Sequence, residues 1–318
     1  MNVNEFPFSS NPSVPVVTVE LADFQAAGVR LDLLRLDRVH PMISGNKWFK
    51  LKYAFEAVLR SDCQRVLSFG GAWSNHIHAL AFAGRERGVE TIAVIRGDEP
   101  VKLSDTLQDA QRWGMSLEFV SRAQYRNKYD EVFLQSLRAR YGEFHLLPEG
   151  GSGEWVVAGC REILSLCDIA DYDLVCCACG TGGTLAGLIA GKPKGLAVLG
   201  VPVLKGGDFL YQDIRNILFR AGVDDPGGWE LDLEGHEGGY AKITPALALS
   251  MRYFFEATGV ELEPVYTGKA FLALQRKLSA GELAWGSRVL LIHTGGMQGL
   301  RGMQETLSKR LSQSRESS

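Results

Sequence analysis

The amino-acid sequence predicts an α/β fold arranged in two lobes. From about residue 50, short apolar runs typical of strands alternate with segments of helical periodicity, the pattern of parallel sheets joined by crossover helices. This pattern occurs in two sets, separated by the glycine-containing segment EFHLLPEGGSGE at residues 143–154. A chain of 318 residues is also long enough for two packed cores. We therefore expect a cleft between the lobes, where ligands usually bind.

The first set of elements begins with a helix at NKWFKLKYAFEAVLR (46–60), in which Leu51, Phe55 and Val58 recur at helical spacing. We expect strands in RVLSF (65–69), ETIAVIRG (90–97) and SLEFVS (116–121), the first of them buried. We expect helices between them in SNHIHALAFAGRERG (74–88), which Gly88 ends, and in LSDTLQDAQRWG (103–114). This regular alternation predicts a parallel sheet.

The second set of elements follows residue 153. We expect a helix in EWVVAGCREILSLC (154–167) and strands in DLVCCA (173–178) and GLAVLGVPV (195–203). Between the two strands, GTGGTLAGLIAG (180–191) is expected to form a glycine turn that opens another helix. Residues 203–244 are rich in Gly, Asp and Pro, so we expect long loops there, close to a functional site.

Composition and charge indicate a small-molecule ligand. Hydrophobic residues make up 46% of the chain and charged residues 22%, as in ordinary globular proteins. The 34 basic and 37 acidic residues give a net charge of −3 without a Lys/Arg-rich block, which disfavours nucleic acid and anionic membranes as partners. No apolar run reaches the roughly 20 residues that span a bilayer, and the N-terminus lacks the pattern of a signal peptide.

The six cysteines do not predict a disulfide framework in a chain of this size. DLVCCACG contains a C-x-x-C spacing, but on a buried strand Cys176 and Cys179 would point to opposite faces. We therefore expect small core residues here, with no metal site. Reduced thiols also fit a cytoplasmic protein.

The turn in CGTGGTLAG (179–187) is predicted to bind a phosphate group. It follows a strand and opens a helix, so glycine amides and the helix N-terminus can face an anion. Thr181 and Thr184 add hydroxyl donors. No Lys follows the glycines as in nucleoside-triphosphate loops, and LAVLGVPV lacks the acidic residue of dinucleotide sites. The alternative interpretation is a tight turn without a ligand.

A second strand-to-helix turn lies in FGGAWSNHIH (69–78). Ser74 and Asn75 are preferred residues for capping a helix N-terminus, and this structural role is one interpretation. The other interpretation is a clamp for a carboxylate, held by the same N-terminus. His76 and His78 are two residues apart and do not share a helix face, so a metal-binding pair is not expected.

Lys47 stands in the first turn of the helix expected at 46–60. The helix dipole opposes a cation there, and this field lowers the pKa of the amine. Such a lysine suits Schiff-base chemistry, although a solvated lysine at a helix start fits the same local pattern. Together, a reactive lysine, a phosphate-binding turn and a carboxylate clamp indicate pyridoxal 5'-phosphate as the cofactor. Lys50 and Lys52 are expected to be a supporting residue and a solvated charge, respectively.

The chain resembles the 1-aminocyclopropane-1-carboxylate deaminase/D-cysteine desulfhydrase family over about residues 34–296. SGNKWFKLKY, SFGGAWSNHIHALAFAG, CGTGGTLAGL, EPVYTGKAFLAL and LIHTGG occur in the order and spacing of that family. The resemblance implies a pyridoxal-phosphate-dependent enzyme of fold type II, with two domains as in tryptophan synthase β and the cofactor in the cleft. Residues 1–50 and 149–318 would form the large, cofactor-binding domain and residues 51–148 the small α/β domain. The family usually forms homodimers.

The resemblance also implies roles for individual residues. Lys47 would bind the cofactor covalently and act as the catalytic base, and Asn75 would hydrogen-bond the ring hydroxyl of the cofactor. The phosphate would be held by Gly180, Thr181, Gly182, Gly183 and Thr184. Ser74, Asn75 and His76 would receive the substrate carboxylate. Tyr240, in GGYAK, resembles an active-site tyrosine of the family and would also bind the substrate. Tyr240 or Ser74 would assist proton transfer.

Two positions favour the D-cysteine desulfhydrase branch of the resemblance. In EPVYTGK, Thr267 stands at the place that faces the pyridine nitrogen, where the ring-opening deaminases carry Glu. In HTGG, Thr294 stands where those deaminases carry Leu. A hydroxyl can leave the nitrogen neutral and weaken the electron sink, which suits β-elimination. Phe49 and His78 replace arginines of the family, so the substrate itself is left open.

The expected function is removal of the α-proton and a β-leaving group from a small amino acid, as in the conversion of D-cysteine to pyruvate, sulfide and ammonia. The alternative within the family is 1-aminocyclopropane-1-carboxylate deaminase, which forms 2-oxobutyrate and ammonia. Two alternatives come from other classes of protein. One is a non-catalytic pyridoxal-phosphate carrier, and the other is a nicotinamide-dependent dehydrogenase that uses the GTGG turn.

Overall fold

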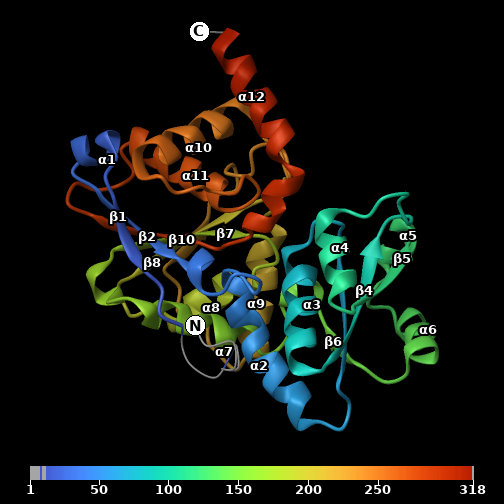
Figure 1. Ribbon diagram of the computed structural model, residues 1–318. Helices are drawn as coiled ribbons and strands as arrows, with labels where there is room; N and C mark the ends of the chain where they lie inside the picture. The colour runs from blue at the N-terminus through green and yellow to red at the C-terminus, as the bar shows by residue number, and fades with distance from the viewer. Residues whose placement is uncertain (1–7, 9–11, 317–318) are drawn as a thin grey trace.

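Two sheets organise the chain, and they confirm the predicted α/β fold with parallel strands. The computed structural model describes residue 8 and residues 12–316. In this part of the chain, one sheet has six strands and the other has four. We call the six-stranded sheet with its helices the large lobe and the four-stranded sheet with its helices the small lobe. Figure 1 shows the large lobe on the left and the small lobe on the right.

The sheet of the large lobe has the strand order β1-β2-β10-β7-β8-β9. Its strands are β1 (Val16–Val19), β2 (Arg30–Arg35), β10 (Arg288–His293), β7 (Leu174–Cys179), β8 (Ala197–Pro202) and β9 (Trp229–Leu231). β1 is antiparallel to β2, and all other neighbouring strands are parallel. Because β10 pairs with both β2 and β7, strands from the two ends of the chain belong to one sheet.

Helices cover both faces of the large-lobe sheet (Figure 1). The helices are α10 (Pro245–Thr258) and α11 (Thr267–Ser279) on one face, and α2 (Asn46–Arg60), α7 (Val156–Arg161), α8 (Gly183–Gly191) and α9 (Phe209–Arg220) on the other. Alternate side chains of β7 enter the two layers, with Cys176 on the α10/α11 side and Cys179 on the α8 side. The predicted opposite orientation of these two cysteines is therefore confirmed, and all six cysteines are free thiols.

The small lobe has the strand order β5-β4-β3-β6. Its parallel strands are β5 (Ser116–Val120), β4 (Glu90–Arg96), β3 (Arg65–Gly70) and β6 (His145–Leu147), and its helices are α3 (Asn75–Arg87), α4 (Asp105–Arg112), α5 (Arg122–Arg126) and α6 (Glu131–Tyr141). Serine side chains cap α3, α4 and α5, and Gly88 ends α3 in the left-handed conformation. These caps explain why the predicted element boundaries in this half hold.

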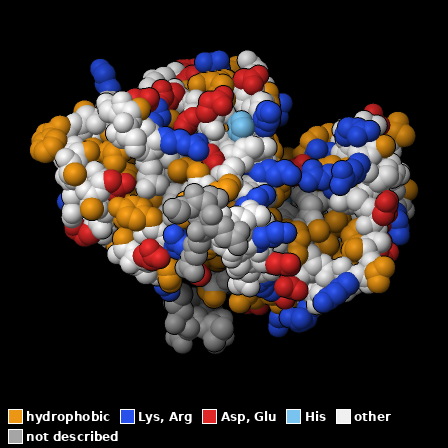
Figure 2. Space-filling view, turned by 90° about the horizontal axis from the view of Figure 1, so that it is seen from above, with side chains coloured by type: hydrophobic (Ala, Val, Ile, Leu, Met, Phe, Trp, Pro, Cys, Tyr) orange, Lys and Arg blue, Asp and Glu red, His pale blue; other side chains and the backbone are white. Residues whose placement is uncertain are grey.

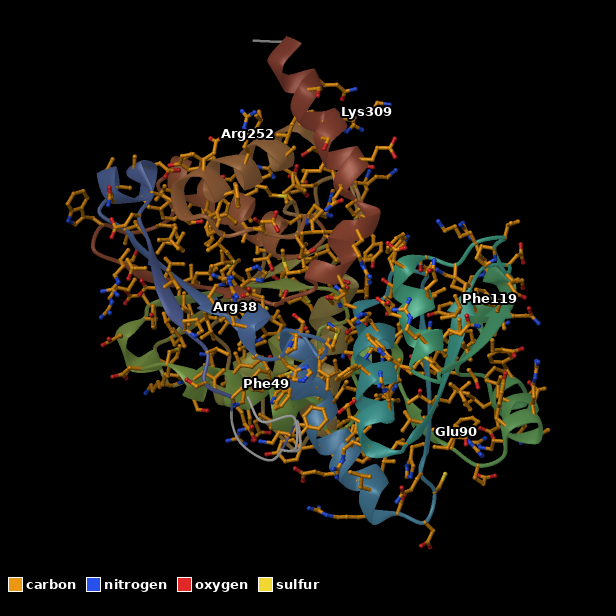
Figure 3. All side chains as sticks on the ribbon, viewed as in Figure 1. Arg38, Phe49, Glu90, Phe119, Arg252 and Lys309 are labelled. Carbon is orange, nitrogen blue, oxygen red and sulfur yellow. The ribbon has the colours of Figure 1, made fainter. Side chains whose placement is uncertain are left out.

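α2 joins the two lobes. It packs against α7 and α8 of the large lobe and against α3 of the small lobe. Figure 3 shows Phe49 on this helix beside the large lobe, whereas Glu90 and Phe119 lie on strands of the small lobe. The domain boundaries given above for residues 50–51 and 148–149 stay a prediction.

One expectation about the second half of the chain is incomplete, and another is wrong. Residues 203–244 are not only loops, because they contain the twelve-residue helix α9 and the short strand β9. Leu210, Ile214 and Leu218 recur at a spacing of four and are buried, which places α9 on the sheet in spite of the Gly- and Asp-rich flanks. The helix expected at 154–167 is α-helical only as far as Arg161 and continues as a 3₁₀ helix, η3 (Glu162–Leu166).

The remaining elements are short or terminal. They are α1 (Ala22–Ala26), α12 (Gln304–Glu316), η1 (Leu36–Arg38), η2 (Glu149–Gly151), η4 (Ile169–Asp171) and η5 (Met297–Gly302). Among the helices of the described residues, none is both long enough and apolar enough to cross a membrane.

Candidate active site

A cavity of about 470 Å³ lies between the two lobes, and the space-filling view shows the surface hollowed there (Figure 2). Its walls come from both sheets, at the carboxyl ends of β3, β4, β7 and β8, where α/β proteins usually bind ligands. The residues predicted from sequence that line it are Lys47, Ser74, Asn75, His76, Gly180, Thr181, Gly182, Thr184, Tyr240 and Thr294. Gly183 and Thr267 are predicted site residues that do not line it. The two predicted turns and the lysine are thus brought together.

The start of α2 is fixed by a close backbone contact. Gly45 has φ +69° and ψ −145°, a conformation that favours glycine. A Cβ atom at this position would lie 1.8 Å from the carbonyl oxygen of Thr294. That same carbonyl accepts a hydrogen bond from the backbone N–H of Asn46 at 3.2 Å. The glycine before the lysine therefore seats the helix start directly on the loop that follows β10.

Lys47 points its amine into the cavity, where the Nζ atom donates to Oδ1 of Asn46 at 2.9 Å. Removal from bulk water, and then the positive charge of Lys50, lower the pKa of the Lys47 amine to about 7. The depressed pKa that was predicted from the helix start is present, but burial contributes most to it. A substantial fraction of this amine is neutral at pH 7, as a nucleophile or base requires.

The glycine turn after β7 forms a cup at the start of α8. Gly182 has φ +79°, and a Cβ on Gly183 would lie 2.8 Å from Oγ of Ser152, so both positions need glycine. Thr184 accepts a hydrogen bond from Nδ2 of Asn46 at 2.8 Å, which ties this cup to the helix that carries Lys47.

Lys50 lines the cavity, whereas the sequence predicted for it only the role of a supporting residue. It is 4% exposed, and its amine donates to the Gly150 carbonyl at 2.9 Å and approaches the hydroxyls of Ser152 and Thr181 at 3.4 and 3.5 Å. These acceptors are neutral, so the amine brings a positive charge to the glycine cup that an anion can balance. The contacts reach 100 to 131 residues along the chain, which no local pattern reveals.

The expectation that Lys52 is a solvated charge is wrong. Its amine lies 2.7 Å from Oε2 of Glu162, and its side chain is 12% exposed. Lys52 and Lys47 point away from each other because positions five apart on an α-helix lie on different faces. Lys52 thus holds α2 against the large lobe and takes no part in the cavity.

Ser74 has the structural role that was one of its two interpretations. Its side chain accepts a hydrogen bond from the backbone N–H of Ile77 at 3.3 Å and so caps α3. The side chain also lines the cavity. The capping bond uses the oxygen as an acceptor, which leaves the hydroxyl hydrogen for a ligand. Roles of Ser74 in catalysis and in substrate binding stay predictions.

The His76 ring is held in one tautomer. Oγ of Ser68 donates to the Leu147 carbonyl at 2.7 Å, so its remaining contact, with Nε2 of His76 at 2.8 Å, requires the ring to donate. Nδ1 is then an unprotonated acceptor, and it is buried without a hydrogen-bond partner. Burial and the nearby Lys47 and Lys50 keep the pKa of His76 well below its usual value. A substrate carboxylate would therefore meet the backbone N–H groups of this helix start, because the ring repels it.

His78 faces the other side of α3, away from the cavity. Its Nε2 lies 3.5 Å from Oδ2 of Asp109 on α4, and Nη2 of Arg301 lies 2.7 Å from the same oxygen. Arg301 belongs to η5 of the large lobe, so this carboxylate joins the two lobes beside the cavity. The prediction that His76 and His78 do not share a face is confirmed.

Thr267 and Thr294 lie together at the wall formed by α11 and β10. Their hydroxyl oxygens are 3.4 Å apart, and the Thr294 backbone N–H donates to Oγ1 of Thr267 at 3.3 Å. Glu263, which the sequence interpretation did not select, also lines the cavity and accepts backbone N–H groups of residues 265–267 at 2.5–2.8 Å. Burial raises the pKa of Glu263 to about 7.

Tyr240 lies at the mouth of the cavity and is 45% exposed. Its ring stands edge-on to that of Tyr266, with the centroids 6.4 Å apart. Two nearby residues, Glu237 and Ala241, have φ of +53° and +57°, which is unusual for residues with side chains. Strain of this kind is often found in loops that serve a site. The catalytic and substrate-binding roles of Tyr240 stay predictions.

The residues of the cavity fit pyridoxal phosphate. Lys50 and the glycine cup can receive a phosphate dianion, because amides, hydroxyls and a buried cation converge there. Oδ1 of Asn75 is buried without a hydrogen-bond partner and can accept from a ring hydroxyl. Lys47 supplies an amine with a lowered pKa. A parallel-sheet fold of two lobes with these three features defines a pyridoxal-phosphate-dependent enzyme of fold type II.

Comparison with known proteins shows the family. The family model described as "Pyridoxal-phosphate dependent enzyme" matches residues 14–295. A protein of Pyrococcus horikoshii with the provisional name 1-aminocyclopropane-1-carboxylate deaminase is 30% identical over 81% of this chain and 81% of its own. The chain belongs to the pyridoxal-phosphate-dependent enzymes, and among them to the 1-aminocyclopropane-1-carboxylate deaminase/D-cysteine desulfhydrase family. The resemblance found in the sequence and the predicted cofactor are confirmed.

Other relatives carry one or both of these activities in their names. The bifunctional D-cysteine desulfhydrase/1-aminocyclopropane-1-carboxylate deaminase of Arabidopsis thaliana, named as mitochondrial, is 28% identical over 86% of this chain and 74% of its own. The D-cysteine desulfhydrase of Salmonella typhi is 24% identical over 84% and 87%. A solved structure of an ACC deaminase homologue has a TM-score of 0.84 at 28% identity and covers 97% of this chain and 98% of that one.

Proposed function

We propose that the protein catalyses β-elimination on a small amino acid with a β-leaving group, as a D-cysteine desulfhydrase does. The observation that supports this most is the pair of threonines at the cavity wall. Two hydroxyl groups, with oxygens 3.4 Å apart, stand where the resemblance gives the ring-opening deaminases a glutamate and a leucine. A hydroxyl pair at these two positions can leave the pyridine nitrogen neutral, which suits a reaction in which a leaving group departs with the electron pair.

Each side chain of the cavity has a part in this proposal. When bound, pyridoxal phosphate supplies an aldehyde that holds the substrate amine and a ring that withdraws electrons from the α-carbon. The neutral Lys47 amine takes the α-proton, and backbone N–H groups at the start of α3 orient the substrate carboxylate. Lys50 and the glycine cup anchor the phosphate. The β-substituent leaves, and water then releases pyruvate and ammonia.

The names of the relatives favour a second candidate. Several proteins with about the same identity carry the provisional name 1-aminocyclopropane-1-carboxylate deaminase. That reaction opens a cyclopropane ring and gives 2-oxobutyrate and ammonia, so its product differs from that of β-elimination by one carbon. The two candidates are therefore separable by product analysis.

A substrate panel tests the proposal. The purified holoenzyme is given both enantiomers of cysteine, β-chloroalanine and O-acetylserine, and separately 1-aminocyclopropane-1-carboxylate. The 2-oxo acids are then identified by chromatography. We expect pyruvate from one enantiomer of at least one β-substituted amino acid, with higher kcat/KM than for the cyclic substrate. Predominant formation of 2-oxobutyrate would assign the deaminase, and bound cofactor without any 2-oxo acid would indicate a non-catalytic carrier.

The enzyme should become less active as the pH falls. The Lys47 amine can accept the α-proton only when it is neutral, and its pKa is lowered to about 7. We expect kcat, which reports the substrate-bound state in which this amine is free, to rise with pH through an apparent pKa well below that of an ordinary lysine. Lys50→Met removes a positive charge that lowers this pKa, so at saturating pyridoxal phosphate the rise should move to higher pH. Lys52→Met, which removes a charge outside the cavity, is the control, and a profile that Lys50→Met leaves unmoved would contradict the assignment.

A further inference from the structure

Arg96 is a charged residue in the cavity that the proposed reaction does not use. It is the last residue of β4, so it stands at the edge of the small-lobe sheet where the carboxyl ends of the strands face the cavity. A Cβ on Gly71 would lie 3.6 Å from Nη2 of Arg96. Gly71 belongs to the same turn as Ser74, and both residues line the cavity. The guanidinium therefore borders the place where the substrate carboxylate is expected.

The guanidinium is held by an aromatic ring. Its Cζ atom lies 5.6 Å from the centroid of the Tyr125 ring, within the range of a cation–π contact. Such a contact orients the group but leaves its N–H donors free for a planar anion, which arginine binds with two parallel hydrogen bonds. No carboxylate forms an ion pair with Arg96 among the residues that the structure describes.

A carboxylate near this end of the cavity is already paired. Glu149 also lines the cavity, and its Oε2 lies 3.4 Å from Nζ of Lys128. The Lys128 amine stacks on the rings of Tyr125 and Tyr129, with distances of 4.8 and 5.0 Å to their centroids. The charges of Lys128 and Glu149 cancel each other. The positive charge of Arg96 therefore remains for a ligand on this wall of the cavity.

We propose that Arg96 binds an anionic group at the side-chain end of the substrate. This inference rests on the proposed β-elimination and narrows its substrate class to amino acids whose β-substituent carries a carboxylate or a comparable anion. The substrate carboxylate would lie at the start of α3 and the second anion next to it at Arg96, while the α-carbon faces Lys47. Arg96 is thus a residue for specificity, and Lys47 performs the chemistry.

A matched pair of esters tests the substrate class. O-Succinylserine and O-acetylserine have similar ester leaving groups, but only the first carries a distal carboxylate. In both, the α-proton passes to Lys47, the Cβ–O bond breaks, and the carboxylate leaves with the electron pair. Water then gives pyruvate and ammonia. We expect a higher kcat/KM for the succinyl ester at low ionic strength. Arg96→Gln should reduce the succinyl-to-acetyl ratio of kcat/KM roughly 10- to 100-fold, the effect of a charge-assisted hydrogen bond.

Two further variants sharpen this test. Arg96→Lys keeps the charge without the planar fork and should keep part of the ratio. Arg122→Gln removes an exposed arginine of the small lobe outside the cavity and should keep all of it. A ratio that Arg96→Gln leaves unchanged, or a wild-type enzyme that prefers the acetyl ester, would overturn the proposal.

A binding measurement separates this inference from the proposed reaction. Glutamate and glutamine have similar shapes, carry no β-leaving group and differ in the distal charge. Calorimetric titration of the holoenzyme should show tighter binding of glutamate by roughly tenfold or more, and Arg96→Gln should abolish the difference. If the wild type releases pyruvate from neither ester but prefers glutamate through Arg96, the elimination is wrong and the anion site stands. Equal binding of both amino acids by the wild type overturns the anion site.

Discussion

Replacing Lys47 by alanine should lower pyruvate formation by roughly 10⁴-fold or more and remove the absorbance of bound cofactor at ~400–430 nm. The alanine variant lacks both the amine that holds the cofactor and the base that takes the α-proton. The fold should remain, because the hydrogen-bond partner of the amine is the side chain of the neighbouring residue, Asn46. Absorbance spectra and a coupled pyruvate assay measure the two losses.

Lys52→Ala is the matched control for the Lys47 variant. It removes a lysine from the same helix, but its amine pairs with Glu162 outside the cavity. We expect the control to retain cofactor absorbance and pyruvate formation, with a modest loss of stability. If Lys47→Ala kept both its absorbance and its activity, another amine would have to serve, and the assignment of the site would be wrong.

Replacing Gly45 by alanine should destabilise the protein by roughly 2–5 kcal/mol. The new Cβ would lie 1.8 Å from the carbonyl oxygen of Thr294, and the backbone has φ +69°. To relieve the overlap, the start of α2 must move away from the loop after β10, and Lys47 must move with it. Chemical unfolding of the apoprotein measures the loss of stability, and cofactor titration measures the accompanying loss of affinity.

Gly88→Ala is the control that separates the steric overlap with Thr294 from the cost of a left-handed backbone. Gly88 has φ +64°, but no atom lies within 4 Å of a Cβ built there. We expect a loss of about 1–2 kcal/mol from the left-handed backbone alone, and unchanged cofactor affinity. A Gly45→Ala protein no less stable than Gly88→Ala would show that the contact with Thr294 does not fix the start of the helix.

The sequence was sufficient for those parts of the site that lie within one strand–turn–helix unit. The turn at 179–187, the cap at Ser74 and the helix start at Asn46 follow from glycine, serine and apolar spacing over about ten residues. Parallel strands carry these turns to the same edge of their sheets, so separate local predictions point to one cavity. Lys47 and the glycine cup were therefore predictable before any contact between them was known.

Other parts of the site depend on partners distant in sequence. The Lys50 amine approaches Thr181 across 131 positions, and Lys52 finds Glu162 across 110. On the helix surface both look like ordinary lysines, and only the packing of α2 against the large lobe distinguishes them. Arg96 and Glu263 likewise become site residues only through the fold, because the cavity that they line is formed by two sheets. The helix α9 was missed since its apolar spacing lies between flanks with the composition of a loop.

The two amines at the base of the cavity make the folded state depend on cofactor supply. Lys47 and Lys50 both lie away from bulk water, and the charge of Lys50 lowers the pKa of Lys47, so the two amines repel each other when both are protonated. A phosphate dianion removes that repulsion and binds only the native chain. By mass action, cofactor at 100 times its Kd adds about 2.7 kcal/mol to the free energy of unfolding. A cell short of this cofactor would therefore hold less of the folded protein as well as less of its activity.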